Sequence, residues 1–181
     1  MAITPPSERI WWNTPIGKTE LIWIAIALLW GVVMFSMMIY WHGRGEQNLS
    51  NEAYRITPEA FLKVTQEEAA KYTVREEAGI PVVHPPPGSD IYMLGRLWQW
   101  WPIFELEKDQ SYRLHLSSLD WQHGFSLLPI NINLQVHPGY DMVLTIKPDQ
   151  AGEYGVVCNE YCGVGHHLMT GRIYVLDKSS E

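Results

Sequence analysis

One short tract near the carboxyl end of the chain combines two thiols, an imidazole and a thioether. It covers residues 158–169, CNEYCGVGHHLM, and its soft donors are Cys158, Cys162, His166 and Met169. Thiolate and thioether ligands select Cu(I), zinc or iron–sulfur clusters, whereas imidazole also suits Cu(II). A second imidazole, His123, lies upstream in DWQHGF and brings the side-chain donors to five. This mixture favours a copper that changes oxidation state.

The number of donors helps to decide which metal site is present. A structural zinc site closes with four ligands, and a thioether is not among its usual donors. A blue-copper site takes two histidines, one cysteine and a weak axial methionine, which leaves the second cysteine without a role. Two thiolates that bridge two coppers use all five donors, with one histidine on each metal. Met169 would then bind one copper, and a backbone carbonyl from between the cysteines would bind the other.

A disulfide is the alternative for the two cysteines, because it is the ordinary state of such a pair in an extracytoplasmic domain. The histidines and the methionine around Cys158 and Cys162 favour the metal site over the disulfide.

The tract resembles the dinuclear copper (CuA) motif of cytochrome c oxidase subunit II: Cys, three residues, Cys, three residues, His, two residues, Met. The resemblance spans roughly residues 91–176 and is particularly close to the smaller B-type heme-copper oxidases. The copper ligands that it implies are the bridging thiolates of Cys158 and Cys162, the imidazoles of His123 and His166, the axial Met169 and the carbonyl oxygen of Glu160. By the same resemblance, His167 is not a ligand. The Glu160 side chain is a candidate ligand for magnesium or manganese at a subunit interface.

The resemblance implies a non-catalytic electron-transfer subunit of a terminal oxidase. Such a subunit accepts electrons from cytochrome c at the copper centre and passes them to heme-copper subunit I, where oxygen is reduced to water. Two alternatives stay open: the CuA domain of a nitric or nitrous oxide reductase, and a copper storage or chaperone module. A chaperone releases its metal and favours exposed, two-coordinate Cu(I), so bridging ligation by both cysteines distinguishes a relay from it.

Tryptophans gather in two places, with Trp98, Trp100 and Trp101 inside four residues and Trp121 two residues before His123. In a strand, Trp98 and Trp100 would share one face and Trp101 would take the other. We expect Trp101 to be ordinary core. The corresponding region of the family receives electrons from cytochrome c, so the resemblance implies that electrons enter at Trp98 or Trp100, with Trp121 the next candidate.

Residues 21–40, LIWIAIALLWGVVMFSMMIY, contain no charged side chain. As a helix they would extend about 30 Å, the hydrocarbon thickness of a bilayer. A cleaved signal peptide has a shorter apolar core, of about 7 to 15 residues. We therefore predict a single-pass anchor in the lipid bilayer, and the resemblance implies the cell (inner) membrane with the copper domain on its outer, periplasmic face. The predicted interfacial anchors are Trp11, Trp12, Trp23, Tyr40 and Trp41.

The chain is expected to have three parts: residues 1–42 with the membrane anchor, a connecting segment at 43–90, and the copper domain at 91–181. In the connecting segment, Thr57, Pro58 and Glu59 predict the start of a short amphipathic helix that extends to about Arg75. Residues 81–88, PVVHPPPG, are predicted to be an extended linker without regular hydrogen bonds.

Beyond residue 90 the pattern of apolar residues is typical of half-buried strands, which we predict at residues 112–116, 132–136, 142–147 and 172–176. Several short strands separated by turns indicate an antiparallel sandwich or barrel. With the resemblance, the predicted fold is mainly β: a Greek-key cupredoxin barrel preceded by one N-terminal transmembrane α-helix.

The net charge of the chain is -7, and no basic patch occurs along it. These features argue against binding of nucleic acid. An acidic surface fits a basic electron-donating partner, since opposite charges steer association.

Overall fold

The computed structural model describes residues 15–44 and 52–177. The chain divides into two compact units, residues 1–48 and 49–181. The predicted anchors Trp11 and Trp12 lie outside the described residues.

Helix α1 (Lys18–Arg44) contains the predicted apolar run and lies in the first unit. Near its start, the backbone N–H of Gly17 donates a hydrogen bond of 2.7 Å to the Glu20 carboxylate, in the region where helix N–H groups lack partners within the helix. Its 27 residues extend about 40 Å at the usual rise per residue. The apolar side chains are exposed all around the helix, so α1 is long and apolar enough to cross a membrane.

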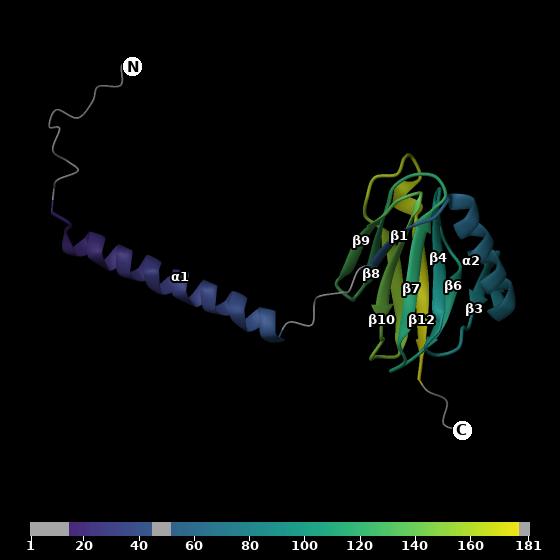
Figure 1. Ribbon diagram of the computed structural model, residues 1–181, viewed down its shortest axis with the longest axis horizontal. Coiled ribbons are helices and arrows are strands. Elements are labelled where there is room, and N and C mark those ends of the chain that lie inside the picture. Colours follow the sequence, from purple (N-terminus) through teal and green to yellow (C-terminus); the bar gives the residue numbers. More distant parts are fainter. Residues whose placement is uncertain (1–14, 45–51, 178–181) are drawn as a thin grey trace, which may run out of the picture. The chain divides into compact units, whose positions relative to one another are not determined.

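The second unit is a sandwich of two β-sheets with one helix (Figure 1). Its elements in chain order are β1 (Glu52–Arg55), α2 (Pro58–Tyr72), β2 (Thr73–Glu77), β3 (Ile80–Val83), β4 (Asp90–Arg96), β5 (Gln99–Trp101), β6 (Ile103–Glu107), β7 (Tyr112–Ser118), β8 (His123–Leu128), β9 (Ile132–Val136), β10 (Tyr140–Ile146), β11 (Gly152–Cys158), the short 3-10 helix η2 (His166–Leu168) and β12 (Thr170–Leu176). One sheet has the order β1-β10-β7-β4-β5, and the other has the order β2-β3-β6-β12-β11-β8-β9.

The four predicted strands are confirmed, since they correspond to β7, β9, β10 and β12. The two sheets pack through one buried apolar cluster to which both contribute, with Leu114 and Leu116 from β7, Phe125 from β8 and Val156 from β11. This arrangement confirms the predicted mainly β, cupredoxin-like fold. The strands form two sheets with open edges, so the unit is a sandwich and not a closed barrel.

Helix α2 confirms the predicted amphipathic helix, although it ends at Tyr72 and residues 73–75, expected at its end, belong to β2. The Thr57 hydroxyl caps its start by accepting a hydrogen bond of 3.3 Å from the Ala60 N–H, and Pro58 occupies the first turn. Phe61, Thr65 and Ala69 are spaced by four residues and form the buried face of α2. The Phe61 ring meets the ring of Tyr92 on β4 edge to face, at 5.9 Å between centroids. The helix therefore belongs to the sandwich, along one side of it (Figure 1).

The prediction of an extended linker at residues 81–88 is wrong for residues 81–83. These residues belong to β3, which pairs antiparallel with β2 and parallel with β6. Pro81 is compatible with this strand because the pairing with β6 begins only at Val82, so its missing N–H costs no bond there. The described part of the predicted connecting segment, residues 52–90, thus contributes to both sheets.

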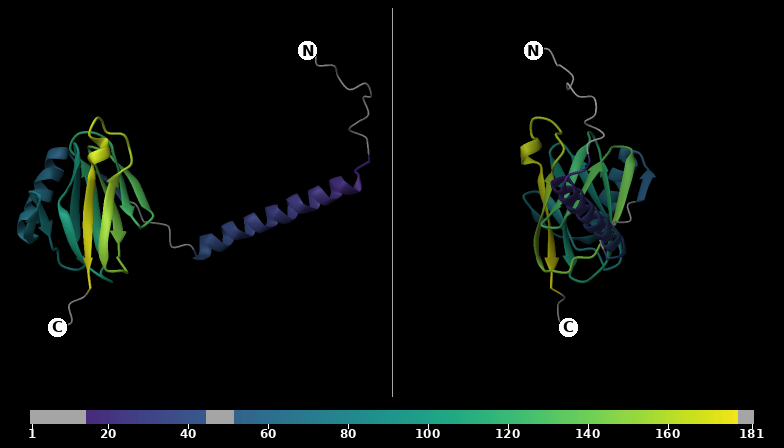
Figure 2. Two further views of the ribbon diagram at one scale, coloured as in Figure 1. Left: turned by 180° about the vertical axis from the view of Figure 1, so that it is seen from behind. Right: turned by 90° about the vertical axis from the view of Figure 1, so that its left-hand side faces the viewer.

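The loop between β11 and β12 carries most of the predicted ligands and lies at one end of the sandwich, where Figure 2 shows it in yellow with η2. The strands on both sides of the loop pair with each other, and each has a second partner: β11 pairs with β8 over Gly155–Cys158, and β12 pairs with β6 over Ile173–Leu176. The loop is therefore held by two central strands of a single sheet.

Replacement of Phe61 with alanine tests whether α2 is part of the sandwich. A buried phenylalanine truncated to alanine leaves a cavity, and we expect a loss of about 3 to 5 kcal/mol in the free energy of unfolding. The measurement is denaturant unfolding of a fragment of residues 49–181. Lys63→Ala, an exposed position of the same helix, should change the free energy by less than about 0.5 kcal/mol. Equal, small effects of both substitutions would mean that α2 is not packed on the sheet.

Candidate metal centre

Strand register brings the first two candidate ligands together. Cys158 is the last residue of β11 and lies directly across from Phe125 on β8. Side chains two residues apart in a strand share a face, so His123 and Phe125 both point toward the core, as Cys158 does. His123 is thus a diagonal neighbour of Cys158, although 35 residues separate them in sequence.

The remaining candidates complete a chain of close contacts. The Cys158 and Cys162 sulfur atoms are 3.8 Å apart, and His123 Nδ1 lies 3.9 Å from Cys158 Sγ. On the other side, Cys162 Sγ lies 3.7 Å from His166 Nδ1 and 3.8 Å from Met169 Sδ. The carbonyl oxygen of Glu160 lies 3.2 Å from Cys158 Sγ. All six predicted donors therefore meet at one place, with one imidazole beside each sulfur.

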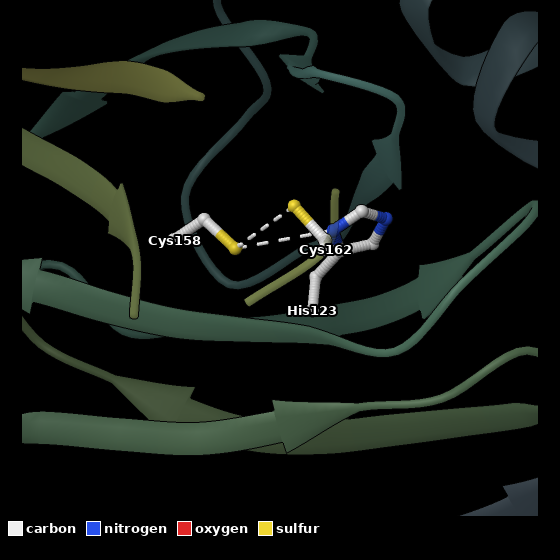
Figure 3. A group of neighbouring side chains, drawn as sticks. All are labelled: His123, Cys158 and Cys162. Atoms are coloured by element: carbon white, nitrogen blue, oxygen red, sulfur yellow. Dashed lines mark hydrogen bonds between the residues drawn. The ribbon is translucent and has the colours of Figure 1, made fainter. Parts of the chain in front are cut away.

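The cysteines are not joined by a disulfide, because 3.8 Å is well beyond the S–S bond length of about 2.0 Å. Figure 3 shows the Cys158 sulfur between the Cys162 sulfur and the His123 ring, with a close contact to each. His123, Cys158, Cys162 and Met169 are buried, whereas His166 is half-buried on η2. Burial and the neighbouring Cys158 raise the pKa of the Cys162 thiol to about 11, so metal binding would release its proton.

The spacing of the donors fits copper ligation. Metal–sulfur bonds of about 2.3 Å and metal–nitrogen bonds of about 2.0 Å, at a tetrahedral angle, put two donors of one metal about 3.5 to 3.8 Å apart. The observed separations of 3.7 to 3.9 Å between neighbouring sulfur and nitrogen donors fall close to this value. Buried thiols, imidazoles and a thioether without a hard oxygen cage are consistent with a copper site.

Asp120 orients the His123 ring. His123 Nε2 donates a hydrogen bond of 2.8 Å to Asp120 Oδ1, which leaves the Nδ1 lone pair directed toward Cys158. A carboxylate behind a histidine ligand fixes its tautomer and orientation in many metal sites. Burial raises the pKa of Asp120, but hydrogen bonds from His123 and from the backbone N–H groups of Trp121 and Leu97 lower it below its ordinary value overall. The carboxylate is therefore held in its charged form.

Two glycines allow the ligand loop to lie close to its neighbours. A Cβ atom on Gly124 would collide with the Asn159 side chain and lie 2.8 Å from the backbone nitrogen of Glu160. A Cβ atom on Gly165 would collide with the Trp98 ring. Any side chain at either position would push the loop away from the sheet.

The tryptophans lie differently from the sequence prediction. Trp100, on β5, is 1% exposed, and its ring packs edge to face against His123 and Phe125. Trp101 is half-buried and packs against the core cluster, so the expectation that it belongs to the core holds in part, whereas Trp100 is the fully buried ring. Trp98 precedes β5 and does not follow its alternation; it is 41% exposed, and Trp121 is 63% exposed. Of these four tryptophans, Trp98 and Trp121 are the most exposed and the best placed to contact another protein.

Three features of the site were not assigned a role by sequence reasoning. Asp120 stands three residues before His123, a spacing that indicates a ligand-orienting carboxylate once His123 is suspected. The contact of Trp98 with the ligand loop and the hydrogen bond of 3.0 Å from the Gln135 amide to the Glu160 carboxylate join residues far apart in sequence. His167, which the resemblance excludes as a ligand, is exposed next to the half-buried His166.

Comparison with known proteins agrees with the copper motif. No family model matches the chain. Over 84% of its length it is 28% identical to cytochrome c oxidase subunit 2 of Thermus thermophilus, 89% of which is covered. It is 35% identical to heme-copper oxidase subunit 2 of Aeropyrum pernix, across 96% of this chain and 87% of the relative.

A likeness of fold accompanies the likeness of sequence. A chain from the cryo-electron microscopy structure of a heme-copper terminal oxidase dimer matches with a TM-score of 0.56 and 21% identity, covering 88% of this chain and all of that chain. The relative from Aeropyrum is similar enough, over enough of both chains, to decide the family. This chain belongs to the family of subunit 2 of the cytochrome c and heme-copper oxidases.

Proposed function

We propose that this chain is the electron-transfer subunit of a terminal oxidase, which accepts electrons from cytochrome c at a dinuclear CuA centre and passes them to the heme-copper subunit I. The observation that carries the proposal is the meeting of both cysteine sulfurs, each with its own imidazole, in one buried cluster. A mononuclear site would leave one of the two thiols without a role.

The proposed ligands divide over two metals. Cys158 and Cys162 would bridge both coppers. His123 and the Glu160 carbonyl oxygen lie on the Cys158 side, whereas His166 and Met169 lie on the Cys162 side. When bound, the metal pair supplies a one-electron couple shared between the two coppers.

The protein side chains keep this site rigid and dry. Buried sulfurs and a fully buried His123 exclude water, and Asp120 holds the proton on His123 Nε2 while Nδ1 faces the sulfurs. The strands that flank the ligand loop limit its movement, and small rearrangement favours fast electron transfer. Trp98 lies at the surface above the loop, and we propose it as the place where electrons enter.

Helix α1 provides the proposed membrane anchor. Its 27 residues include the uncharged run 21–40, which fits a single-pass subunit of the cell membrane. Likeness to the oxidase subunits supports a copper domain on the outer face. Residues 1–42, 43–90 and 91–181 remain our proposed division into anchor, connecting segment and copper domain.

Membership of the oxidase family favours the oxidase over a nitric or nitrous oxide reductase. Burial of both sulfurs disfavours a copper storage or chaperone module, which must expose its metal to release it.

A second metal at Glu160 would need ligands from outside this chain. The Glu160 carboxylate accepts a hydrogen bond from Gln135, and the one group of three metal-ligating side chains within the described residues is His123, Cys158 and Cys162. The proposed magnesium or manganese ion would therefore lie at an interface with a partner subunit.

Copper content tests the dinuclear centre. We expect two copper ions per chain, and a seven-line hyperfine pattern in electron paramagnetic resonance, because one unpaired electron is shared by two equivalent copper nuclei. The measurement is metal analysis and spectroscopy of the copper-loaded chain. One copper with a four-line pattern would contradict the proposal.

Ligand substitutions test the assignment of residues. Cys158→Ser or Cys162→Ser should abolish the seven-line pattern, since a single thiolate cannot hold the pair together. His167→Ala should leave the pattern nearly unchanged, because His167 points to solvent. Spectra recorded on copper-loaded variants decide the matter, and a requirement for His167 with a dispensable His166 would show that the loop is aligned one residue out.

Stopped-flow reduction by reduced cytochrome c tests where electrons enter. Trp98→Leu should slow the reduction of the copper-loaded chain, because it removes the exposed ring that contacts the ligand loop. Trp121→Leu is the matched exposed control and should have the smaller effect. A larger effect of Trp121→Leu would move the point of electron transfer to Trp121, and slow reduction of the unmodified chain would favour another donor.

A further inference from the structure

The proposed ligands come from two segments of the chain, and the turn at Leu97 and Trp98 contacts both. This turn connects β4 with β5. On one side, the Leu97 backbone N–H donates a hydrogen bond of 2.7 Å to Asp120 Oδ2. The other oxygen of the same carboxylate accepts the bond from His123 Nε2. The turn is thereby linked to the His123 imidazole through one carboxylate.

On its other side, the turn contacts the loop that carries the cysteines. Trp98 Nε1–H donates a hydrogen bond of 3.2 Å to the carbonyl oxygen of Cys162, 64 residues away in sequence. The Trp98 ring also lies against Gly163 and Gly165, and at Gly165 the contact leaves no room for a Cβ atom. Both the hydrogen bond and the packing act on the part of the loop between Cys162 and His166.

We propose that Trp98 is a positioning residue that fixes the ligand loop relative to His123, with Gly165 as its packing partner. The proposal rests on the proposed function and extends it, because a residue suited to receive electrons also sets the geometry of the metal ligands. The pairing of β8 with β11 positions Cys158, and the contact between the two backbones ends one residue later with the bond from the Asn159 N–H to the Gly124 carbonyl. Beyond Cys158, the hydrogen bond and ring packing of Trp98, here called the Trp98 brace, restrain the position of Cys162 and of the loop that leads to His166.

A double-mutant cycle on the full-length chain in detergent tests the proposal. Trp98→Phe keeps an aromatic ring but removes the N–H donor, whereas Gly165→Ala keeps the donor and displaces the ring. Trp98→Leu combined with Gly165→Ala relieves the clash. Trp121→Phe is the control, since Trp121 is exposed, whereas the atoms nearest to an added Cβ at Gly163 or Gly165 belong to Trp98. Circular dichroism checks that every variant is folded.

Two kinds of measurement report on the loop, one on the copper-loaded chain and one on the metal-free chain. The first is made on the copper-loaded chain and covers the hyperfine splitting and the rate of copper removal by a Cu(I) chelator. Loss of one hydrogen bond predicts that copper removal is about threefold to tenfold faster in Trp98→Phe. The second is amide hydrogen exchange at residues 162–168 of the metal-free chain, which should become faster in the same variant. Gly165→Ala should alter both measurements in the wild-type background and add little in the Trp98→Leu background.

The positioning role of Trp98 would be contradicted if Trp98→Phe had the same spectrum, copper release and loop hydrogen exchange as the wild type. Equal effects of Trp98→Phe and Trp121→Phe would contradict it too. Failure of the unmodified chain to bind copper would contradict the proposed function, while hydrogen exchange of the metal-free chain would still decide on the brace.

Discussion

The pairing of β8 with β11 is the constraint on which the candidate metal centre depends. It places Cys158 opposite Phe125, and so puts His123 on the same core-facing side, within 3.9 Å of the Cys158 sulfur. A shift of the register by one residue would turn His123 toward the opposite face of the sheet and separate the donors. The backbone continues this fit past the end of β11, where Asn159 N–H bonds to the Gly124 carbonyl at a position with no room for a side chain.

Burial of the donors follows from this arrangement, and it makes the metal-free site unfavourable in free energy. A thiol pair and an imidazole removed from water lose hydration, and weak contacts between sulfurs return little of it. A bound metal would satisfy all of them, so metal binding and the order of the loop should support each other. Aromatic rings complete the enclosure, with Trp100 packed beneath His123 and Trp98 over the loop glycines.

The sequence predicted the elements whose pattern is local, and it named the candidate ligands that the structure brings together. The spacing of Cys158, Cys162, His166 and Met169 lies in one tract, and the alternation at β7 and the proline start of α2 are visible along the chain. Predictions failed where distant partners decide the structure. Pro81 is in a strand because β2 is available to pair with it, opposite Glu76. The alternation expected from Trp98 onward was wrong because β5 begins only at Gln99. The Trp98 bond to Cys162 joins residues that no local pattern connects.

The central claim is that both cysteine sulfurs ligate both metals of a copper pair. X-ray absorption at the copper edge of the loaded full-length chain tests it most directly, because the fine structure reports the atoms next to each copper. The account predicts about two sulfurs near 2.3 Å and one nitrogen near 2.0 Å around each copper, together with scattering from a second copper at short distance. A single sulfur per copper without a copper neighbour would contradict it.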